Sequence, residues 1–213
     1  MSAQRILVIQ SSPRTDEDSV TRDIANTLVS RLVTLGCDDT LTATRECSSL
    51  PFVDQDFIEK STNPMKHAVT STNTAATGAE ENKNEGLEPE HPEDLVWRCS
   101  WECCEELLAA DIIIIAAPCY NFNIPASLKA WVDLCCVIKR TYSFGEAGPA
   151  GLLAGKVAFI VVSTGGMDVG SAYDFGTRYL KHILTLWGVL NITVVEVSHG
   201  DKHRAGQQIA AIA

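Results

Sequence analysis

The residues best suited to chemistry lie at 118–123, where Pro-Cys-Tyr-Asn-Phe-Asn follows an apolar run. Two aromatic rings alternate there with two amides, a pattern that suits a flat ligand ring rich in nitrogen and oxygen. Tyr120 and Phe122 have an alternative role in core packing, and Asn121 and Asn123 have one in turn geometry. Because both kinds of side chain follow one apolar run, we favour a binding site.

Hydroxyl groups gather in a second segment, SSPRTDEDSVT, at residues 11–21. Ser11, Ser12, Ser19 and Thr21 stand just ahead of a predicted helix, whose first main-chain N–H groups attract anions. The segment contains neither GxxxxGK[ST] nor GxGxxG, so it indicates a phosphomonoester held without a metal. The alternative is a polar loop in which Ser19 is simply the helix N-cap.

A third segment, Ser163-Thr164-Gly165-Gly166, follows another apolar run. Paired glycines let the backbone approach a ligand closely, and their N–H groups can bond to carbonyl oxygens, although a tight turn also favours Gly-Gly. A ligand with its phosphate in the second segment and a flat ring between the other two has the shape of FMN.

Strands and helices that alternate along the chain must position these segments. We expect strands at 5–10, 39–45, 112–117, 156–163 and 192–197, and helices at 19–36, 93–110, 125–137 and 173–187, with a loop at 140–154. This alternation predicts an α/β fold: a three-layer sandwich around a five-stranded parallel sheet. We predict the flavodoxin-like strand order 2-1-3-4-5, in which ligands bind at the carboxyl ends of the central strands.

Chain length, net charge and cysteine content limit the kinds of protein that this chain can be. The 213 residues predict one domain, 1–213, and a net charge of −10 argues against nucleic acid and anionic membranes as partners. No apolar run reaches the roughly 18 residues that span a bilayer, and the first one is too short for a signal peptide, so we expect a cytoplasmic enzyme. Because we expect no signal peptide, we also expect the eight cysteines to be reduced thiols, and their spacing does not suit a metal site.

Residues 61–92 differ from the rest of the chain, since they are rich in Ser, Thr, Asn and Glu and poor in large apolar side chains. Such a segment buries too little surface to order its backbone. We expect a mobile polar insertion, with a functional lid as the alternative.

Taken in order, SSPR…SVT, APCYNFNIPASLKAWVD, GPAGLLAGK and STGGM resemble the FMN-dependent NADH-azoreductase family, the short flavodoxin-like NAD(P)H:quinone reductases. The similarity is closest from 111 to 200. It implies non-covalent FMN and a homodimer. It also implies a ping-pong cycle in which NADH or NADPH passes a hydride to FMN N5, and two electrons then go to a quinone or an azo compound.

The resemblance also assigns cofactor contacts residue by residue. The phosphate and ribityl end of FMN is expected to contact Ser12, Ser19, Val20 and Thr21. The isoalloxazine is expected to contact, largely through main-chain atoms, Pro118, Cys119, Tyr120, Asn121 and Phe122. Its pyrimidine edge is expected to contact Ser163, Thr164, Gly165 and Gly166. Because the cofactor carries the chemistry, we nominate no catalytic side chain and no metal ligand.

The chain departs from the family pattern in three places. The insertion at 61–92 is longer, Asp168 stands where relatives often have histidine, and the last helix is expected to be short. The first alternative function is a flavodoxin-type electron carrier without its own NAD(P)H activity, which the acidic surface favours. Against it, the segment at 11–21 lacks the flavodoxin phosphate-loop pattern. The second alternative is a binding protein that kept the fold and lost the flavin.

Overall fold

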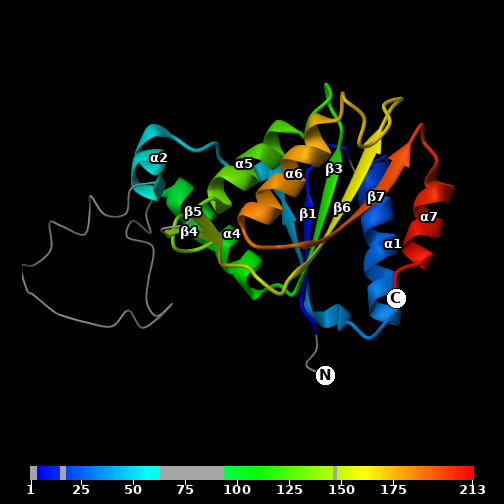
Figure 1. Ribbon diagram of the computed structural model, residues 1–213, viewed down its shortest axis with the longest axis horizontal. Coiled ribbons are helices and arrows are strands. Elements are labelled where there is room, and N and C mark those ends of the chain that lie inside the picture. Colours follow the sequence, from blue (N-terminus) through cyan, green and yellow to red (C-terminus); the bar gives the residue numbers. More distant parts are fainter. Residues whose placement is uncertain (1–3, 15–17, 63–93, 146–147) are drawn as a thin grey trace, which may run out of the picture.

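A five-stranded parallel sheet organises the computed structural model, which describes residues 4–14, 18–62, 94–145 and 148–213. Across the sheet its strands are β2 (Thr42–Glu46), β1 (Ile6–Gln10), β3 (Ile112–Pro118), β6 (Val157–Thr164) and β7 (Asn191–Ser198) (Figure 1). Counted along the chain, these five strands have the order 2-1-3-4-5. The predicted flavodoxin-like topology is therefore confirmed, with the most polar strand at one edge.

Helices cover both faces of the sheet, as a three-layer sandwich requires (Figure 1). One face packs against α1 (Val20–Thr34) and α7 (Lys202–Ala210). The other packs against α4 (Leu95–Ala109), α5 (Ala126–Cys135) and α6 (Phe175–Leu186). A further helix, α2 (Gln55–Thr62), packs Phe57 against Trp97.

The isoleucine run shows why β3 lies in the middle of the sheet. Ile113 and Ile115 belong to the apolar cluster under α4, α5 and α6, whereas Ile112 and Ile114 belong to the cluster under α1 and α7. Alternate residues of a strand point to opposite faces, so only a strand with helices on both sides buries all four.

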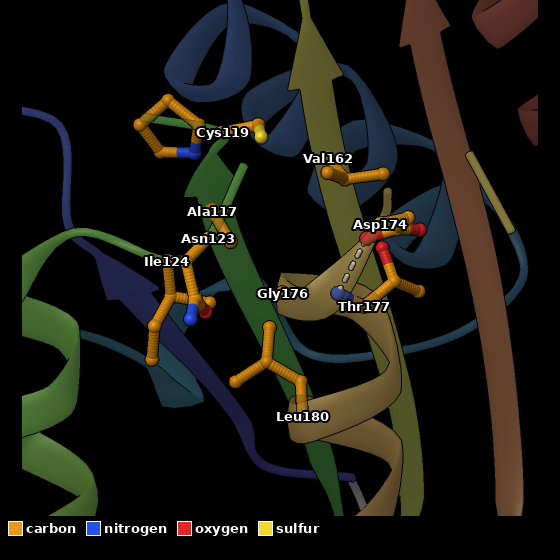
Figure 2. A pocket seen from close by; sticks show the side chains of 10 residues that line it. Ala117, Cys119, Asn123, Ile124, Val162, Asp174, Gly176, Thr177 and Leu180 are labelled. Atoms are coloured by element: carbon orange, nitrogen blue, oxygen red, sulfur yellow. Dashed lines mark hydrogen bonds between the residues drawn. The ribbon is translucent and has the colours of Figure 1, made fainter. Parts of the chain in front are cut away.

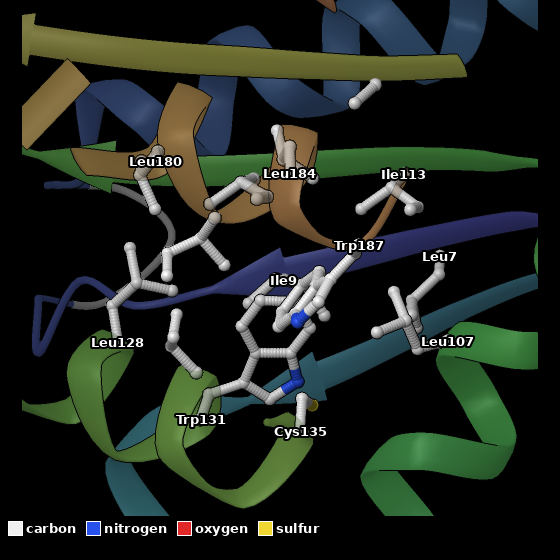
Figure 3. Packing of buried hydrophobic residues seen from close by; sticks show 14 of the residues in the cluster. Leu7, Ile9, Leu107, Ile113, Leu128, Trp131, Cys135, Leu180, Leu184 and Trp187 are labelled. Atoms are coloured by element: carbon white, nitrogen blue, oxygen red, sulfur yellow. The ribbon is translucent and has the colours of Figure 1, made fainter. Parts of the chain in front are cut away.

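Two tryptophans pack within the apolar cluster under α4, α5 and α6 (Figure 3). Trp131 of α5 and Trp187, which ends α6, are both fully buried and meet edge-on with their ring centroids 5.6 Å apart. This geometry places the positive edge of one ring against the negative face of the other. The pair fixes α5 and α6 relative to each other, and these helices frame the loops at the carboxyl ends of β3 and β6.

The structure corrects two of the expected elements. The predicted loop at 140–154 contains an antiparallel hairpin of β4 (Tyr142–Gly145) and β5 (Gly148–Gly151), whose glycines and proline concealed its alternating Tyr142 and Phe144. The predicted strand at 39–45 begins later, because Asp39–Leu41 form a 3-10 turn.

The predicted insertion at 61–92 lies outside the described residues, apart from its first two positions, which end α2. In the described parts of the chain, no helix has the length and apolar character needed to cross a membrane. All eight cysteines are free thiols.

Candidate functional site

The three predicted segments meet at the carboxyl edge of the sheet. The Cys119 N–H donates to the Ser163 carbonyl oxygen at 2.8 Å, which joins the segments that follow β3 and β6. The Ser11 hydroxyl donates to the Ala116 carbonyl at 2.7 Å, which ties the segment after β1 to the same edge. β1, β3 and β6 are neighbours in the sheet, so one ligand can reach all three segments.

The amino end of α1 is built to receive an anion. Ser19 is the N-cap, and its hydroxyl oxygen accepts from the Arg22 N–H at 3.5 Å and lies 3.4 Å from the Thr21 hydroxyl. The N–H groups of Val20 and Thr21 belong to the first turn, where an α-helix offers no internal partner. Two main-chain donors and the positive end of the helix dipole therefore face the same point.

Ser12 adds a hydroxyl beside this helix end. Its oxygen accepts from the Arg14 N–H at 3.2 Å, just as the Ser19 oxygen accepts from Arg22. The Ser12 hydroxyl proton is left to donate to an anionic oxygen, and the hydrogen-bonded Ser19 and Thr21 hydroxyls leave one further proton between them. Ser12, Ser19 and Thr21 are all nearly fully buried, so such bonds would form away from bulk water. This donor set fits the phosphate of FMN.

The segment after β3 makes a tight reverse turn. Tyr120 and Asn123 exchange two main-chain hydrogen bonds, of 2.9 and 3.1 Å. Between them Asn121 and Phe122 both have positive φ, 52° and 67°. Asparagine tolerates this conformation, but phenylalanine does so at a cost of roughly 1–3 kcal/mol. The surrounding structure holds an aromatic ring in a strained, half-exposed position, as ligand sites often do.

The segment after β6 presents open backbone. A Cβ added at Gly165 would meet no atom within 4 Å, and one at Gly166 would meet only the His199 ring, at 3.8 Å. The Thr164 hydroxyl donates to the Met167 carbonyl, so its proton is not available to a ligand. The space at the two glycines fits the close approach of a flat ring.

A small pocket lies behind the turn, between β3, β6 and the start of α6 (Figure 2). Its buried polar residues are Asp174 and Thr177. Asp174 caps α6 by accepting from the Thr177 N–H and also accepts from the Gly170 N–H. Burial raises the pKa of the Cys119 thiol at the mouth of the pocket, and the negative charge of Asp174 raises it further. Cys119 therefore lines the site as a neutral thiol.

Sequence reasoning missed two groups at this edge. His199, at the end of β7, has φ 55° and packs its ring beside Gly166, with Nε2 3.7 Å from the Asp168 carboxylate. Tyr173 and Phe175 expose their rings next to the turn, where Tyr173 lies 6.3 Å from Phe122 between ring centroids. The only sequence signal for these residues was their position, since His199 follows the predicted strand at 192–197 and both aromatics lie at the start of the predicted helix at 173–187.

Comparison with known proteins agrees with this geometry. The family described as having a flavodoxin-like fold matches residues 4–213. The FMN-dependent NADH:quinone oxidoreductase of Thiobacillus denitrificans is 35% identical over 197 residues, which cover 92% of this chain and 85% of the relative. The enzyme of the same name from Erythrobacter litoralis is 33% identical, covering 98% and 94% of the two chains.

Solved structures repeat the fold at lower sequence identity. An FMN-dependent NADH-azoreductase from Bacillus anthracis, in complex with FMN, superimposes with a TM-score of 0.75 at 16% identity, covering 97% of this chain and 95% of that one. An azoreductase from the Sterne strain of that organism gives a TM-score of 0.73 at 18% identity, covering 98% and 94%. The chain thus belongs to the flavodoxin-like family that includes the FMN-dependent NADH:quinone oxidoreductases.

Proposed function

We propose that this protein is an FMN-dependent oxidoreductase, which passes a hydride from NADH or NADPH through FMN to quinones and azo compounds. The observation that carries the proposal is the meeting of three unlike segments at one edge of the sheet. These are an anion-binding helix end, a strained aromatic turn and an open glycine pair. The segment that leads to the helix end is bonded to Ala116 of β3, and the turn and the glycine segment are bonded to each other. FMN has a phosphate and a flat ring to match them.

The residues that would hold FMN divide into three groups. Its phosphate would accept from the hydroxyls of Ser12, Ser19 and Thr21 and from the main-chain N–H groups of Val20 and Thr21. Its ring would lie along the segment at the end of β3, which consists of Pro118, Cys119, Tyr120, Asn121 and Phe122. The carbonyl oxygens of its pyrimidine edge would face the N–H groups of the segment Ser163, Thr164, Gly165 and Gly166.

Bound FMN supplies the redox chemistry, because it takes up two electrons and a hydride and can pass both electrons to an acceptor. The chain supplies orientation and a partly dry site. Phe122 and Tyr173 expose flat rings beside the proposed flavin site, where a nicotinamide or a quinone can stack. No side chain of this site has to act as a nucleophile.

A flavodoxin-type electron carrier is the competing function. Relatives that match over most of their length are named as NADH:quinone oxidoreductases, which supports the enzyme over the carrier. The exposed aromatic pair supports it too, because a carrier that meets a partner protein does not need a place for nicotinamide.

We further propose that the chain acts as one domain in a cytoplasmic homodimer. The eight free thiols suit a reducing compartment. Large apolar side chains that one protomer leaves exposed, Phe144 on the hairpin and Leu152 just after it, suit an interface with a second copy. Sedimentation equilibrium tests the assembly, and a protein that stays monomeric at micromolar concentration would rule it out.

The test of the activity is a steady-state assay. Purified protein supplied with FMN should oxidise NADH or NADPH when a benzoquinone is present, and should decolourise an azo dye with the same donor. Parallel rather than intersecting reciprocal plots should identify the ping-pong order. Protein that takes up no FMN, or takes it up and oxidises neither nucleotide, would contradict the proposal.

A further inference from the structure

Arg22 makes an unusual set of contacts beside the proposed phosphate site. It lies in the first turn of α1, where a positive charge is disfavoured by the helix dipole. Its guanidinium bonds both oxygens of Glu46, at 2.6 and 2.5 Å, and the same Nη2 donates to the Ser12 carbonyl oxygen at 3.1 Å. Only 11% of its side chain is exposed.

These contacts join three parts of the carboxyl edge. Ser12 follows β1, Glu46 ends β2, and Arg22 belongs to α1. A planar guanidinium that bonds a carboxylate with two nitrogens has one preferred direction, so it also fixes where its third bond points. The Ser12 carbonyl is therefore held in one orientation by a group that is itself held by β2.

The direction of this carbonyl matters for anion binding. A carbonyl oxygen turned toward a phosphate would repel it, and the next residue, Pro13, has no N–H to compensate. With its carbonyl taken by Arg22, Ser12 keeps its hydroxyl to offer to the anion. Glu46 balances the charge of Arg22, so the pair contributes order to the site and little net charge.

We propose that Arg22 is a positioning residue for the flavin phosphate, which it serves by holding the Ser12 carbonyl away from the anion with Glu46 as its anchor. This inference rests on the proposed FMN site and extends it to a residue that does not touch the cofactor. It implies that Arg22 contributes to the affinity for FMN but not to the affinity for riboflavin, which has the same ring and no phosphate.

A second arginine of the same sheet provides a matched control. Arg45 precedes Glu46 in β2 and faces the opposite way, where it makes a two-nitrogen ion pair with Glu106 of α4. Its side chain is 18% exposed, close to the value for Arg22. Removing either arginine breaks a comparable pair, but only Arg22 contacts the segment after β1.

The experiment measures the dissociation constants of FMN and riboflavin for flavin-free protein, by quenching of flavin fluorescence. Arg22→Gln should weaken FMN binding by about tenfold and leave riboflavin binding within about twofold. Arg22→Lys, which keeps a donor, and Glu46→Gln, which removes the anchor's charge, should give smaller losses of the same kind. Arg45→Gln should lower the melting temperature and leave the ratio of the two constants unchanged.

The ratio separates this inference from the function on which it rests. Suppose that wild-type protein binds FMN but Arg22→Gln leaves the ratio of the FMN to the riboflavin dissociation constant unchanged. Arg22 then has only a structural role, and the same conclusion follows if Arg45→Gln changes this ratio equally. If wild-type protein binds neither flavin, the proposed function fails as well. A ratio of the FMN to the riboflavin dissociation constant that rises only in the variants at positions 22 and 46 supports the positioning role.

Discussion

The hydrogen bond from the Cys119 N–H to the Ser163 carbonyl, 2.8 Å long, joins the ends of β3 and β6. It continues the ladder in which Pro118 lies opposite Ser163, so the aromatic turn and the glycine pair leave the sheet together. The distance between the two segments is thus set by the sheet and not by flexible loops. A ligand that contacts both segments meets a preformed arrangement, which lowers the entropic cost of binding.

Replacement of Thr21 by valine should weaken FMN binding by about tenfold, because it removes a buried hydroxyl from the proposed phosphate site and keeps the β-branched shape. Thr27→Val is the matched control. That residue also lies in α1, but its hydroxyl donates to the Asp23 carbonyl on the exposed side. Equal losses of FMN affinity in the two variants, measured by fluorescence titration, would contradict the assignment.

Replacement of Phe122 by asparagine should leave the free energy of unfolding unchanged within about 1 kcal/mol, because the ring is half exposed and asparagine accepts positive φ more readily. NADH oxidation should nevertheless slow, since the ring lines the proposed site. Phe57→Ala gives the contrast: it truncates a ring that is 1% exposed and should cost about 3–5 kcal/mol in urea unfolding. If Phe122→Asn is destabilised as much and keeps full activity, Phe122 is a packing residue.

Cys119 should react with iodoacetamide more slowly than a free cysteine at neutral pH. Burial and Asp174 raise the pKa of its thiol, so the reactive thiolate forms only at higher pH. Asp174→Asn removes the negative charge and keeps a good N-cap, so it should lower the pKa and speed the reaction. Peptide mapping by mass spectrometry across a pH series follows this cysteine alone. A rate at or above that of free cysteine would contradict the raised pKa.

Gly151→Ala should destabilise the protein severely. A Cβ at this position would lie 2.0 Å from the Gly188 nitrogen and 2.2 Å from the Trp187 carbonyl carbon, so β5 and the end of α6 would have to separate. The matched change is Gly206→Ala in α7, where a Cβ meets nothing within 4 Å; it should stabilise by up to about 1 kcal/mol. Thermal unfolding of the two variants compares them directly, and similar melting temperatures would refute the packing argument.

The sequence predicted the sheet because its signals are local. Ile112–Ile115 read as a strand buried on both faces, and Ser19 as the start of a helix, without knowledge of the rest of the chain. The hairpin of β4 and β5 was missed because glycine and proline are uncommon in strands, and here they pair with Tyr142, Phe144 and Gly145. The segments predicted to follow β1, β3 and β6 do lie together at the carboxyl edge of the sheet, since a parallel sheet brings those strand ends together.

The parts of the site that escaped prediction depend on three-dimensional placement. Nothing around Arg22 in the sequence shows that it bonds Glu46 and the Ser12 carbonyl, because those contacts need β1, β2 and α1 to be assembled. His199 reaches Gly166 only because β7 lies beside β6. The contacts of FMN itself stay a prediction for all three segments.

Anaerobic stopped-flow mixing of the FMN-loaded protein with NADH, followed by mixing with a quinone, tests the central claim most directly. We predict that the yellow protein bleaches rapidly with NADH and regains its colour when the quinone is added. A protein that binds FMN but keeps its colour with both NADH and NADPH would be an electron carrier, and one that remains colourless in excess FMN would have no flavin site at this edge of the sheet.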